Sequence, residues 1–364
     1  LHAELHSFPT RRSSDLMPMA EIPNWLVQAW ALAKSLGAAD LHAVSGERVR
    51  FRLHGELRCI DDLPCCPPAP WPEVQSLFGS LCSALTNTES GLTHPELGRA
   101  RASLAAHQGG WMLVMRLIAE HIPSLADVQL SRQHADLALA DHGLLLVTGA
   151  TGSGKSSTLA AWLGHWREQR RGDVISLEDP IEFVHRNSPT LGLINQREIG
   201  RDCASFADGL RAALRQDPDV LLVGELRDSD SARLALMAAE TGHLVMATLH
   251  TASAVGAIDR LLSLFPTDER GLAQAQLADT LRAVMAQQLI WSAETTDQLA
   301  STKASAPRAH ACREVLIATP AIRHLIREHR LGDIEHIMQT HASLGMQTMT
   351  QAMAALPTKI ALSR

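Results

Sequence analysis

The amino-acid sequence predicts an α/β protein in which a small α+β domain precedes a larger doubly wound α/β domain and a helical C-terminal region. Two observations lead to this fold class. The 364 residues are enough for two domains, each with a sizeable core. After about residue 125, short apolar runs alternate with helical segments, which is the pattern of buried parallel strands and their crossover helices. We therefore expect domains at residues 17–125 and 126–291, and a C-terminal region at 309–364.

The first domain begins after residues 1–16, which precede Met17, show no helical or strand period, and are interpreted as a non-native extension. Apolar residues at helical spacing predict a helix at 22–36, which ends at Gly37. Strand pairs are predicted at 49–53 with 56–60 and at 100–106 with 111–118. The prolines between positions 64 and 72 predict an extended loop. Together these elements make a small α+β domain.

The second domain is predicted from apolar runs at residues 144–148, 174–177, 220–223 and 244–248. Helical segments lie between them at 156–168, 206–215 and 230–240. Residues 292–308 are rich in Ala, Ser and Thr, which predicts a flexible loop before the helical region.

Composition and charge argue against several classes of protein. The formal net charge of −6 disfavours non-specific binding to nucleic acid, which needs a clustered basic surface. The cysteines form no C-x-x-C pair, so neither a zinc ribbon nor a dithiol redox site is indicated. No apolar run approaches the ~18 residues of a membrane span, and the N-terminus lacks the apolar region of an export signal. We therefore expect a cytoplasmic location.

A phosphate-binding loop is the most specific motif in the chain. Residues 149–156 fit the P-loop pattern G-x-x-x-x-G-K-[ST], between a predicted strand and a predicted helix as the motif requires. Glycines let backbone N–H groups converge on phosphate oxygens, and the helix N-terminus adds partial positive charge. Lys155 is expected to reach the β- and γ-phosphates, and the Ser156 hydroxyl to ligate Mg²⁺. The expected ATP-binding residues are Gly149, Ala150, Thr151, Gly152, Ser153, Gly154, Lys155, Ser156 and Ser157.

Acidic residues follow two of the predicted strands. Glu225 comes after the run 220–223 and a glycine, and Glu178 follows the run 174–177. Both carboxylates are expected at the carboxyl edge of the sheet, where nucleotides bind. Acids at strand ends also cap helices, so position alone leaves both interpretations open. His243 and His250 are ambiguous as well, because a spacing of seven suits one face of a helix whereas the residues between them have a strand pattern.

Five motifs follow one another in an order that resembles a known family. They are the P-loop at 149–156, L-E-D-P-I-E-F at 177–183, N-Q-R-E-I-G at 195–200, R-Q-D-P-D-V through G-E-L-R-D at 215–228, and T-G-H-L-V-M-A-T-L-H-T at 241–251. They look like the Walker A, Asp box, Walker B and His box motifs of the type II/IV secretion and pilus ATPases, over residues 36–356. The resemblance implies a RecA-like P-loop ATPase domain preceded by a small PAS-like α+β domain.

The resemblance also implies a role for each matching residue. Glu225 would be the Walker B acid, acting at Mg²⁺ through its water shell, and Glu178 would polarise the attacking water. His243 and His250 would be the His-box pair, which senses the γ-phosphate or relays its loss. Ala150 stands where the family more often has proline, which leaves the phosphate-contacting groups in place.

Motors of this family complete the site with arginines of the N-terminal domain. Arg101 and Arg116 match the strands that carry them, and an arginine fork there would neutralise charge on the γ-phosphoryl oxygens. At 101–103 the chain has Arg-Ala-Ser where the family usually has Arg-x-Arg, so one arginine of that set is missing. The alternative is that both are solvated strand arginines.

Two features favour the pilus retraction branch of the family. The tetra-cysteine zinc insertion of extension and secretion ATPases is absent, and A-I-R-H-L-I-R-E-H-R at 321–330 closely resembles the signature helix of retraction ATPases. The apolar residues of that helix share one face, and Arg323, Arg327 and Arg330 are expected opposite. The resemblance implies a homo-hexameric motor that uses ATP and Mg²⁺ on the cytoplasmic face of the inner membrane. Such a motor pulls back pilin through a membrane platform protein.

Three alternatives remain open at this point. The first is a related extension or secretion motor. The second is an accessory subunit that binds nucleotide and only tunes a true motor. The third, a nucleic-acid translocase, would share the ATPase core but is disfavoured by the acidic charge and by the lack of an evident basic or aromatic strand-binding loop.

Overall fold

The computed structural model describes residues 22–53, 56–60, 88–107, 110–118, 121–291 and 309–356. The chain forms two compact units, Leu1–Glu120 and His121–Arg364, whose boundary lies close to the domain end expected near residue 125. The expectations for residues 1–16, for the prolines at 64–72, for the loop 292–308 and for the end of the helical region beyond residue 356 concern positions outside the described residues.

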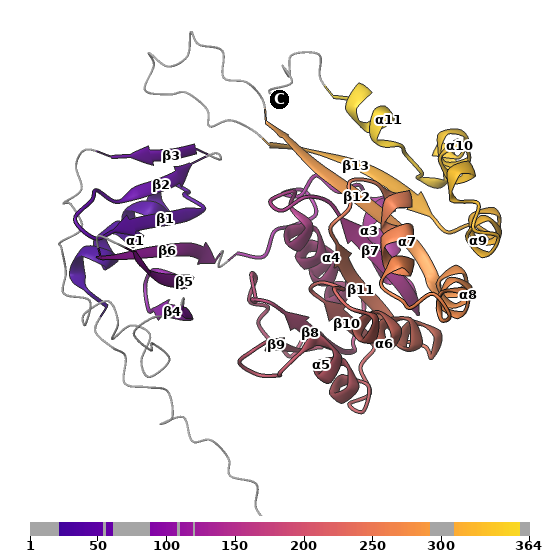
Figure 1. The fold of residues 1–364 in the computed structure, drawn as a ribbon, viewed down its shortest axis with the longest axis horizontal. Helices are drawn as coiled ribbons and strands as arrows, with labels where there is room; N and C mark the ends of the chain where they lie inside the picture. Colours follow the sequence, from indigo (N-terminus) through magenta and orange to yellow (C-terminus); the bar gives the residue numbers. More distant parts are fainter. Residues whose placement is uncertain are drawn as a thin grey trace, which may run out of the picture. The chain divides into compact units, whose positions relative to one another are not determined.

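The N-terminal unit is a six-stranded antiparallel sheet in the order β3-β2-β1-β6-β5-β4, with helix α1 packed on it (Figure 1). Alternating side chains of β6, among them Trp111 and Leu113, are buried against Leu26 and Trp30 of α1, which gives this unit its own core. The predicted helix and both predicted strand pairs are confirmed, whereas β1 and β4 were not predicted. The elements are α1 (Asn24–Ser35), β1 (Asp40–Val44), β2 (Arg50–Leu53), β3 (Glu56–Cys59), β4 (Thr88–His94), β5 (Gly98–His107) and β6 (Gly110–Ile118).

The second unit is built on a seven-stranded mixed sheet in the order β13-β12-β7-β11-β10-β8-β9. Its strands are parallel from β12 to β9, and β13 is antiparallel to β12. The four predicted apolar runs are confirmed as β7, β8, β10 and β11. The strands are β7 (Gly143–Thr148), β8 (Asp173–Glu178), β9 (Leu193–Glu198), β10 (Val220–Val223), β11 (Leu244–Leu249), β12 (Leu281–Trp291) and β13 (Ala309–Ile317).

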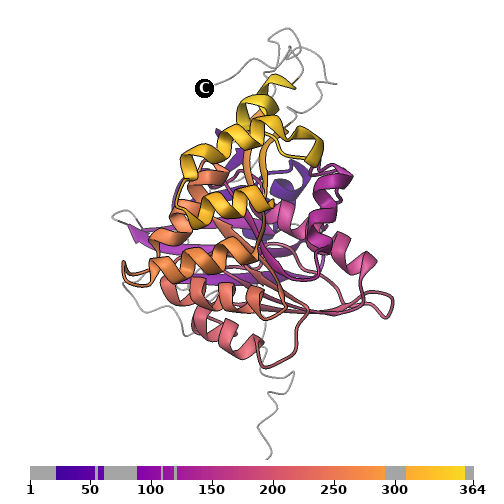
Figure 2. The ribbon, with the colours of Figure 1, turned by 90° about the vertical axis from the view of Figure 1, so that its right-hand side faces the viewer.

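Helices cover both faces of this sheet, which explains why the central strands are apolar without alternation. Leu144 and Leu146 of β7 point into a core shared with α5 to α10, whereas Leu145 and Val147 point into a core shared with α3 and α4. Figure 2 shows the C-terminal helices beside α8, against which α9 packs. The helices are α3 (Arg132–Ala135), α4 (Lys155–Gln169), α5 (Phe206–Ala213), α6 (Ser229–Glu240), α7 (Ala254–Ser263), α8 (Arg270–Thr280), α9 (Pro320–Arg327), α10 (Ile334–Thr340) and α11 (Met349–Ala354).

The expectation that the whole of residues 309–364 is helical was wrong at its start. Residues 309–317 form β13, which pairs with β12 along its full length, from Ala309 with Trp291 to Ile317 with Ala283. Val315 and Leu316 of β13 are buried in the two cores of the sheet, so pairing and burial make this segment a strand. From Pro320 onward the chain forms α9, α10 and α11.

Helix α9 also differs from the expected arrangement of its arginines. Arg323 does not lie on an outer face, because its guanidinium donates to the carbonyl oxygens of Ala278 at 2.7 Å, Leu281 at 2.7 Å and Ala318 at 3.0 Å. The contacts with Ala278 and Leu281 place it at the C-terminal end of α8, where a cation is favourable. Arg327 forms an ion pair with Asp279. Helix α9 therefore contacts α8 through Arg323 and Arg327 as well as through its apolar face.

None of the helices in the described part of the chain combines the length and the apolar character that crossing a bilayer requires.

Candidate nucleotide-binding site

The carboxyl ends of four parallel strands meet at one edge of the second sheet. The register pairs Thr148 of β7 with Leu249 of β11, Ala247 of β11 with Val223 of β10, and Val223 with Leu177 of β8. The residues that directly follow these strands therefore lie side by side. Open α/β sheets bind their ligands at this edge.

The P-loop connects β7 to α4, as the sequence predicts. Gly149, Gly152 and Gly154 have φ angles of 147°, 79° and 87°, which side-chain-bearing residues rarely adopt. A Cβ at Gly149 would collide with the carbonyl oxygen of Gln287, and one at Gly154 would lie 2.7 Å from Nε2 of Gln287. The loop backbone thus passes directly over β12, and only glycine fits at these two positions. The remaining predicted ATP-binding residues lie in the loop or in the first turn of α4: Ala150, Thr151, Ser153, Lys155, Ser156 and Ser157.

Lys155 is the first residue of α4, and its Nζ donates to the carbonyl oxygens of Gly149 at 2.9 Å and Ala150 at 3.0 Å. Burial lowers the pKa of Lys155, and the nearby carboxylates of Glu225 and Glu182 act in the opposite direction. Lys155 is therefore close enough to the acids that follow β8 and β10 to interact with them electrostatically.

Glu178 is the last residue of β8, and its carboxylate is held from two sides. Ser176 Oγ donates to Oε1 at 2.7 Å, and Gln196 Nε2 donates to the same oxygen at 3.0 Å. Burial raises the pKa of Glu178, and these two hydrogen bonds partly oppose the rise. Gln196 also donates to the carbonyl oxygen of Phe183 at 2.8 Å and accepts from the backbone N–H of His185 at 2.8 Å. One glutamine thus fixes both the carboxylate and the chain that follows it.

Glu225 follows β10 after Gly224, and its carboxylate contacts an arginine and a histidine. Its Oε2 accepts from Arg227 Nε at 2.7 Å, and its Oε1 lies 3.2 Å from Nε2 of His250. Arg227 reaches Asp179 as well, at 3.4 Å. The acid after β10 and the histidine after β11 are therefore in direct contact.

His243 does not join this group. It precedes β11, and its carbonyl oxygen accepts from the N–H of Gly143 at the start of β7, whereas His250 follows β11. The six residues of β11 lie between them, so seven steps of ~3.3 Å put His243 roughly 23 Å from His250. His243 Nδ1 lies 3.0 Å from the carbonyl oxygen of Ala238, at the end of α6. The expectation that both histidines serve one site is wrong within this chain, because the segment between them is a strand.

Arg101 and Arg116 belong to the N-terminal unit, where β5 and β6 place them directly opposite each other. Arg116 Nε donates to Oδ1 of Asp40 at 2.8 Å, and Arg52 Nε lies 3.6 Å from the other oxygen of that buried carboxylate. Arg116 therefore has a contact inside its own unit, and its role at a nucleotide stays a prediction.

Three residues with contacts in the site were not predicted. Gln196 and Arg227 lie within the N-Q-R-E-I-G and G-E-L-R-D motifs, so a signal for them was present. Gln287 of β12 touches the P-loop, and its segment carried no strand signal because Ala, Gln, Leu and Met are all good helix formers.

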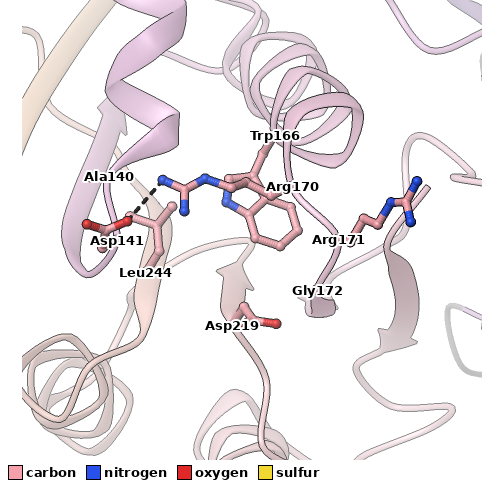
Figure 3. A pocket seen from close by; sticks show the side chains of 8 residues that line it. All are labelled: Ala140, Asp141, Trp166, Arg170, Arg171, Gly172, Asp219 and Leu244. Atoms are coloured by element: carbon pink, nitrogen blue, oxygen red, sulfur yellow. Dashed lines mark hydrogen bonds and ion pairs between the residues drawn. The ribbon is translucent and has the colours of Figure 1, made fainter. Parts of the chain in front are cut away.

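A cavity of about 270 Å³ lies at the opposite edge of the sheet (Figure 3). Leu244 at the start of β11, and Gly172 and Asp219 just before β8 and β10, line it. Arg170 beside it is paired with Asp141 at 2.9 Å. Because this edge is formed by the amino ends of the strands, the cavity is separate from the P-loop.

Fold and site together define a P-loop nucleotide-binding protein with an α/β core. The sequence profile of the family described as "Type II/IV secretion system protein" matches residues 100–358. The chain belongs to this family.

The similarity extends over nearly the whole length of this chain and of its relatives. The type IV pilus retraction ATPase PilT of Pseudomonas aeruginosa is 36% identical over 347 residues, which cover 93% of this chain and 96% of that protein. A twitching motility protein of Neisseria gonorrhoeae is 41% identical over 367 residues, with 95% and 94% coverage. The crystal structure of the pilus retraction motor PilT with bound ADP matches with a TM-score of 0.75 and 32% identity, covering 93% of this chain and 98% of that one. The chain is therefore a PilT-like ATPase.

Proposed function

We propose that the chain is a homo-hexameric, ATP-hydrolysing motor that drives type IV pilus retraction and so twitching motility. The observation that carries this proposal is the meeting of the P-loop, Glu178, Glu225 and His250 at one edge of a parallel sheet. Similarity to a retraction ATPase and to a twitching motility protein along nearly their whole lengths supports it.

In this proposal a PAS-like N-terminal domain and a RecA-like ATPase domain rotate against each other as ATP is hydrolysed. The ring works at the cytoplasmic face of the inner membrane, where it turns a platform protein, and pilin is withdrawn as a result. Contact with the membrane is peripheral and passes through the platform protein. Nucleic acid is not a partner.

Magnesium fits the residues at this edge. Ser156 and Glu225 supply a hydroxyl and a carboxylate, the hard oxygen ligands that Mg²⁺ prefers, and Mg²⁺ usually takes only one or two ligands from the protein beside phosphate oxygens and water. Within the described residues, no group of three or more His, Cys, Asp or Glu side chains is placed to hold a metal. The remaining Mg²⁺ ligands in this proposal are therefore phosphate oxygens and water. Bound Mg²⁺ would neutralise charge on the phosphoryl oxygens.

The remaining roles follow from chemistry and position. The P-loop and Lys155 hold the phosphates, and Glu178 orients and polarises the attacking water. His250, in contact with Glu225, reports the presence of the γ-phosphate. Arg101 and Arg116 reach the phosphates from the N-terminal domain and complete the site.

Complementation of a retraction-deficient strain tests the proposal. The wild-type chain should restore twitching and reduce the number of surface pili. The Lys155→Ala chain, accumulated to the same level, should leave the strain non-twitching and its surface pili unreduced. A purified chain that hydrolyses ATP but leaves the strain non-motile would instead favour a related extension or secretion motor. A chain that binds ATP without hydrolysing it would favour an accessory subunit.

A further inference from the structure

A buried polar contact joins the P-loop to β12. Gln287 is 4% exposed, and its Nε2 donates to the carbonyl oxygen of Ser153 at 2.5 Å. Its Oε1 accepts from Thr158 Oγ1 of α4 at 2.7 Å and from Arg313 Nε of β13 at 3.2 Å. The orientation of the amide is determined by these partners, because a guanidinium only donates and a carbonyl only accepts.

Arg313 extends the contact to the far side of β13. This residue is 6% exposed, and its two terminal nitrogens donate to the carbonyl oxygen of Gln129 at 3.0 Å and to that of Val128. The three hydrogen-bond acceptors of Arg313 are the side-chain amide oxygen of Gln287 and two backbone carbonyl oxygens, so its charge is met by carbonyl and amide dipoles. Burial lowers the pKa of Arg313 to about 10.

The carbonyls that Arg313 contacts belong to residues 124–130, here named the junction segment, which lies just after the boundary between the two units. Gln129 has a φ of 55° and holds β13 by donating to the carbonyl oxygen of Ala309 at 2.8 Å. Val128 and Leu130 are buried in the core that α4 shares with the sheet. The junction segment is thus anchored to the ATPase unit at the end of a continuous polar path.

We propose that Gln287 is a positioning residue for the P-loop, and that through Arg313 it transmits the nucleotide state of that loop to the junction segment. A shift of the loop that moved Ser153 would leave a buried amide and a buried carbonyl without partners, which is unfavourable. The shift is therefore passed on: Gln287 follows Ser153, Arg313 follows Gln287, and the carbonyls of residues 128 and 129 follow Arg313. Hydrogen bonds arranged in series inside a protein reinforce one another, which favours such concerted movement.

Gln287→Glu tests the first link, because it keeps the acceptor for Arg313 and Thr158 but replaces the donor to Ser153 with a carboxylate oxygen. The matched control is Gln288→Glu, the same change on the next residue of β12, whose side chain is exposed. The full-length chain is titrated with MgADP, and amide hydrogen exchange of residues 124–130 is followed with and without saturating MgADP. We expect ADP affinity to fall about tenfold, the loss of one hydrogen bond, and the ADP-dependent change in exchange to disappear. Gln288→Glu should behave as wild type.

Arg313→Lys tests the second link, because lysine keeps the charge but cannot reach both carbonyls and Gln287 with one nitrogen. It should lose the exchange response of the junction segment while ADP affinity falls less than in Gln287→Glu. It also keeps the test decisive if Gln287→Glu does not fold, as judged by circular dichroism. An Arg313→Lys chain with the full response, a Gln287→Glu chain that binds ADP as tightly as Gln288→Glu, or a wild-type chain without any response at 124–130 would each overturn the inference.

The inference rests on the proposed placement of the nucleotide in the P-loop, and the two can fail separately. Unchanged ADP affinity in Lys155→Ala would contradict that placement. Weakened binding in Lys155→Ala together with unchanged binding in Gln287→Glu would contradict only the role of Gln287.

Discussion

Replacing Gln196 with leucine should impair hydrolysis through Glu178. Leucine has a similar volume but removes the donor 3.0 Å from Oε1 of Glu178. It also removes the contacts that hold Phe183 and His185. Ser176→Ala removes the other donor, at 2.7 Å, without touching that loop. Both variants therefore remove a hydrogen bond to Glu178, but only Gln196→Leu also removes the contacts that hold Phe183 and His185.

The size of the effect follows from the type of hydrogen bond. A hydrogen bond to a charged acceptor contributes roughly 1.5–3 kcal/mol, and each ~1.4 kcal/mol of barrier is a factor of ten in rate, so turnover at neutral pH should fall roughly ten- to a hundredfold. Burial raises the pKa of Glu178, and the bonds from Gln196 and Ser176 lower it. Loss of either bond raises the pKa further; the charge of the neighbouring Glu182 acts in the same direction, and a hydrogen bond from its backbone acts against it. The ionised form that polarises water then appears only at higher pH.

The measurement is phosphate release at saturating MgATP as a function of pH. The acid limb of turnover should move to higher pH in Gln196→Leu and in Ser176→Ala. Asn195→Ala is the control, since Asn195 is the preceding residue of β9, is exposed, and contacts Asp173 at the other edge of the sheet. If the acid limb of both variants coincided with that of Asn195→Ala, Glu178 would not be the group whose ionisation limits hydrolysis.

Three further outcomes are expected. Lys155→Ala should lower turnover at least about a hundredfold in a phosphate-release assay, because a preorganised cation at the phosphates is lost, and near wild-type turnover would contradict the P-loop assignment. Glu225→Gln should still bind ATP but turn over at least about tenfold more slowly; a smaller loss would move the main catalytic role to Glu178. Arg323→Ala should lower the free energy of unfolding by roughly 1.5–3 kcal/mol in denaturant titrations, since the α8 carbonyls lose a charged donor, whereas Arg327→Ala, which removes an exposed ion pair, should lower it by under about 1 kcal/mol. Equal losses for the two variants would mean that Arg323 does not cap α8.

For helix α9, the apolar period of the sequence predicted the buried face correctly but the position of Arg323 incorrectly. Ile322, Leu325 and Ile326 are buried as the helical period predicts. Arg323 was expected on the opposite face, yet a long side chain can turn back to a neighbouring element, and here the end of α8 offers several carbonyl oxygens. Functional tests of that face are therefore better made at Arg327 and Arg330, whose contacts are exposed ion pairs.

Patterns local in the chain were enough to predict the P-loop and the central strands β7, β8, β10 and β11, and to place Glu178 and Glu225 at the carboxyl ends of two of them, because glycine spacing and apolar runs are read within a few residues. The tertiary structure alone decided what depends on pairing between distant segments. The strand β11 carries His250 to the site and leaves His243 at the other edge, and pairing with β7 and β13 turns a helix-prone sequence into β12. That pairing brings Gln287 into contact with the P-loop, more than a hundred residues earlier in the sequence. The sequence could not predict this contact, because pairing between distant strands leaves no periodic pattern in either segment.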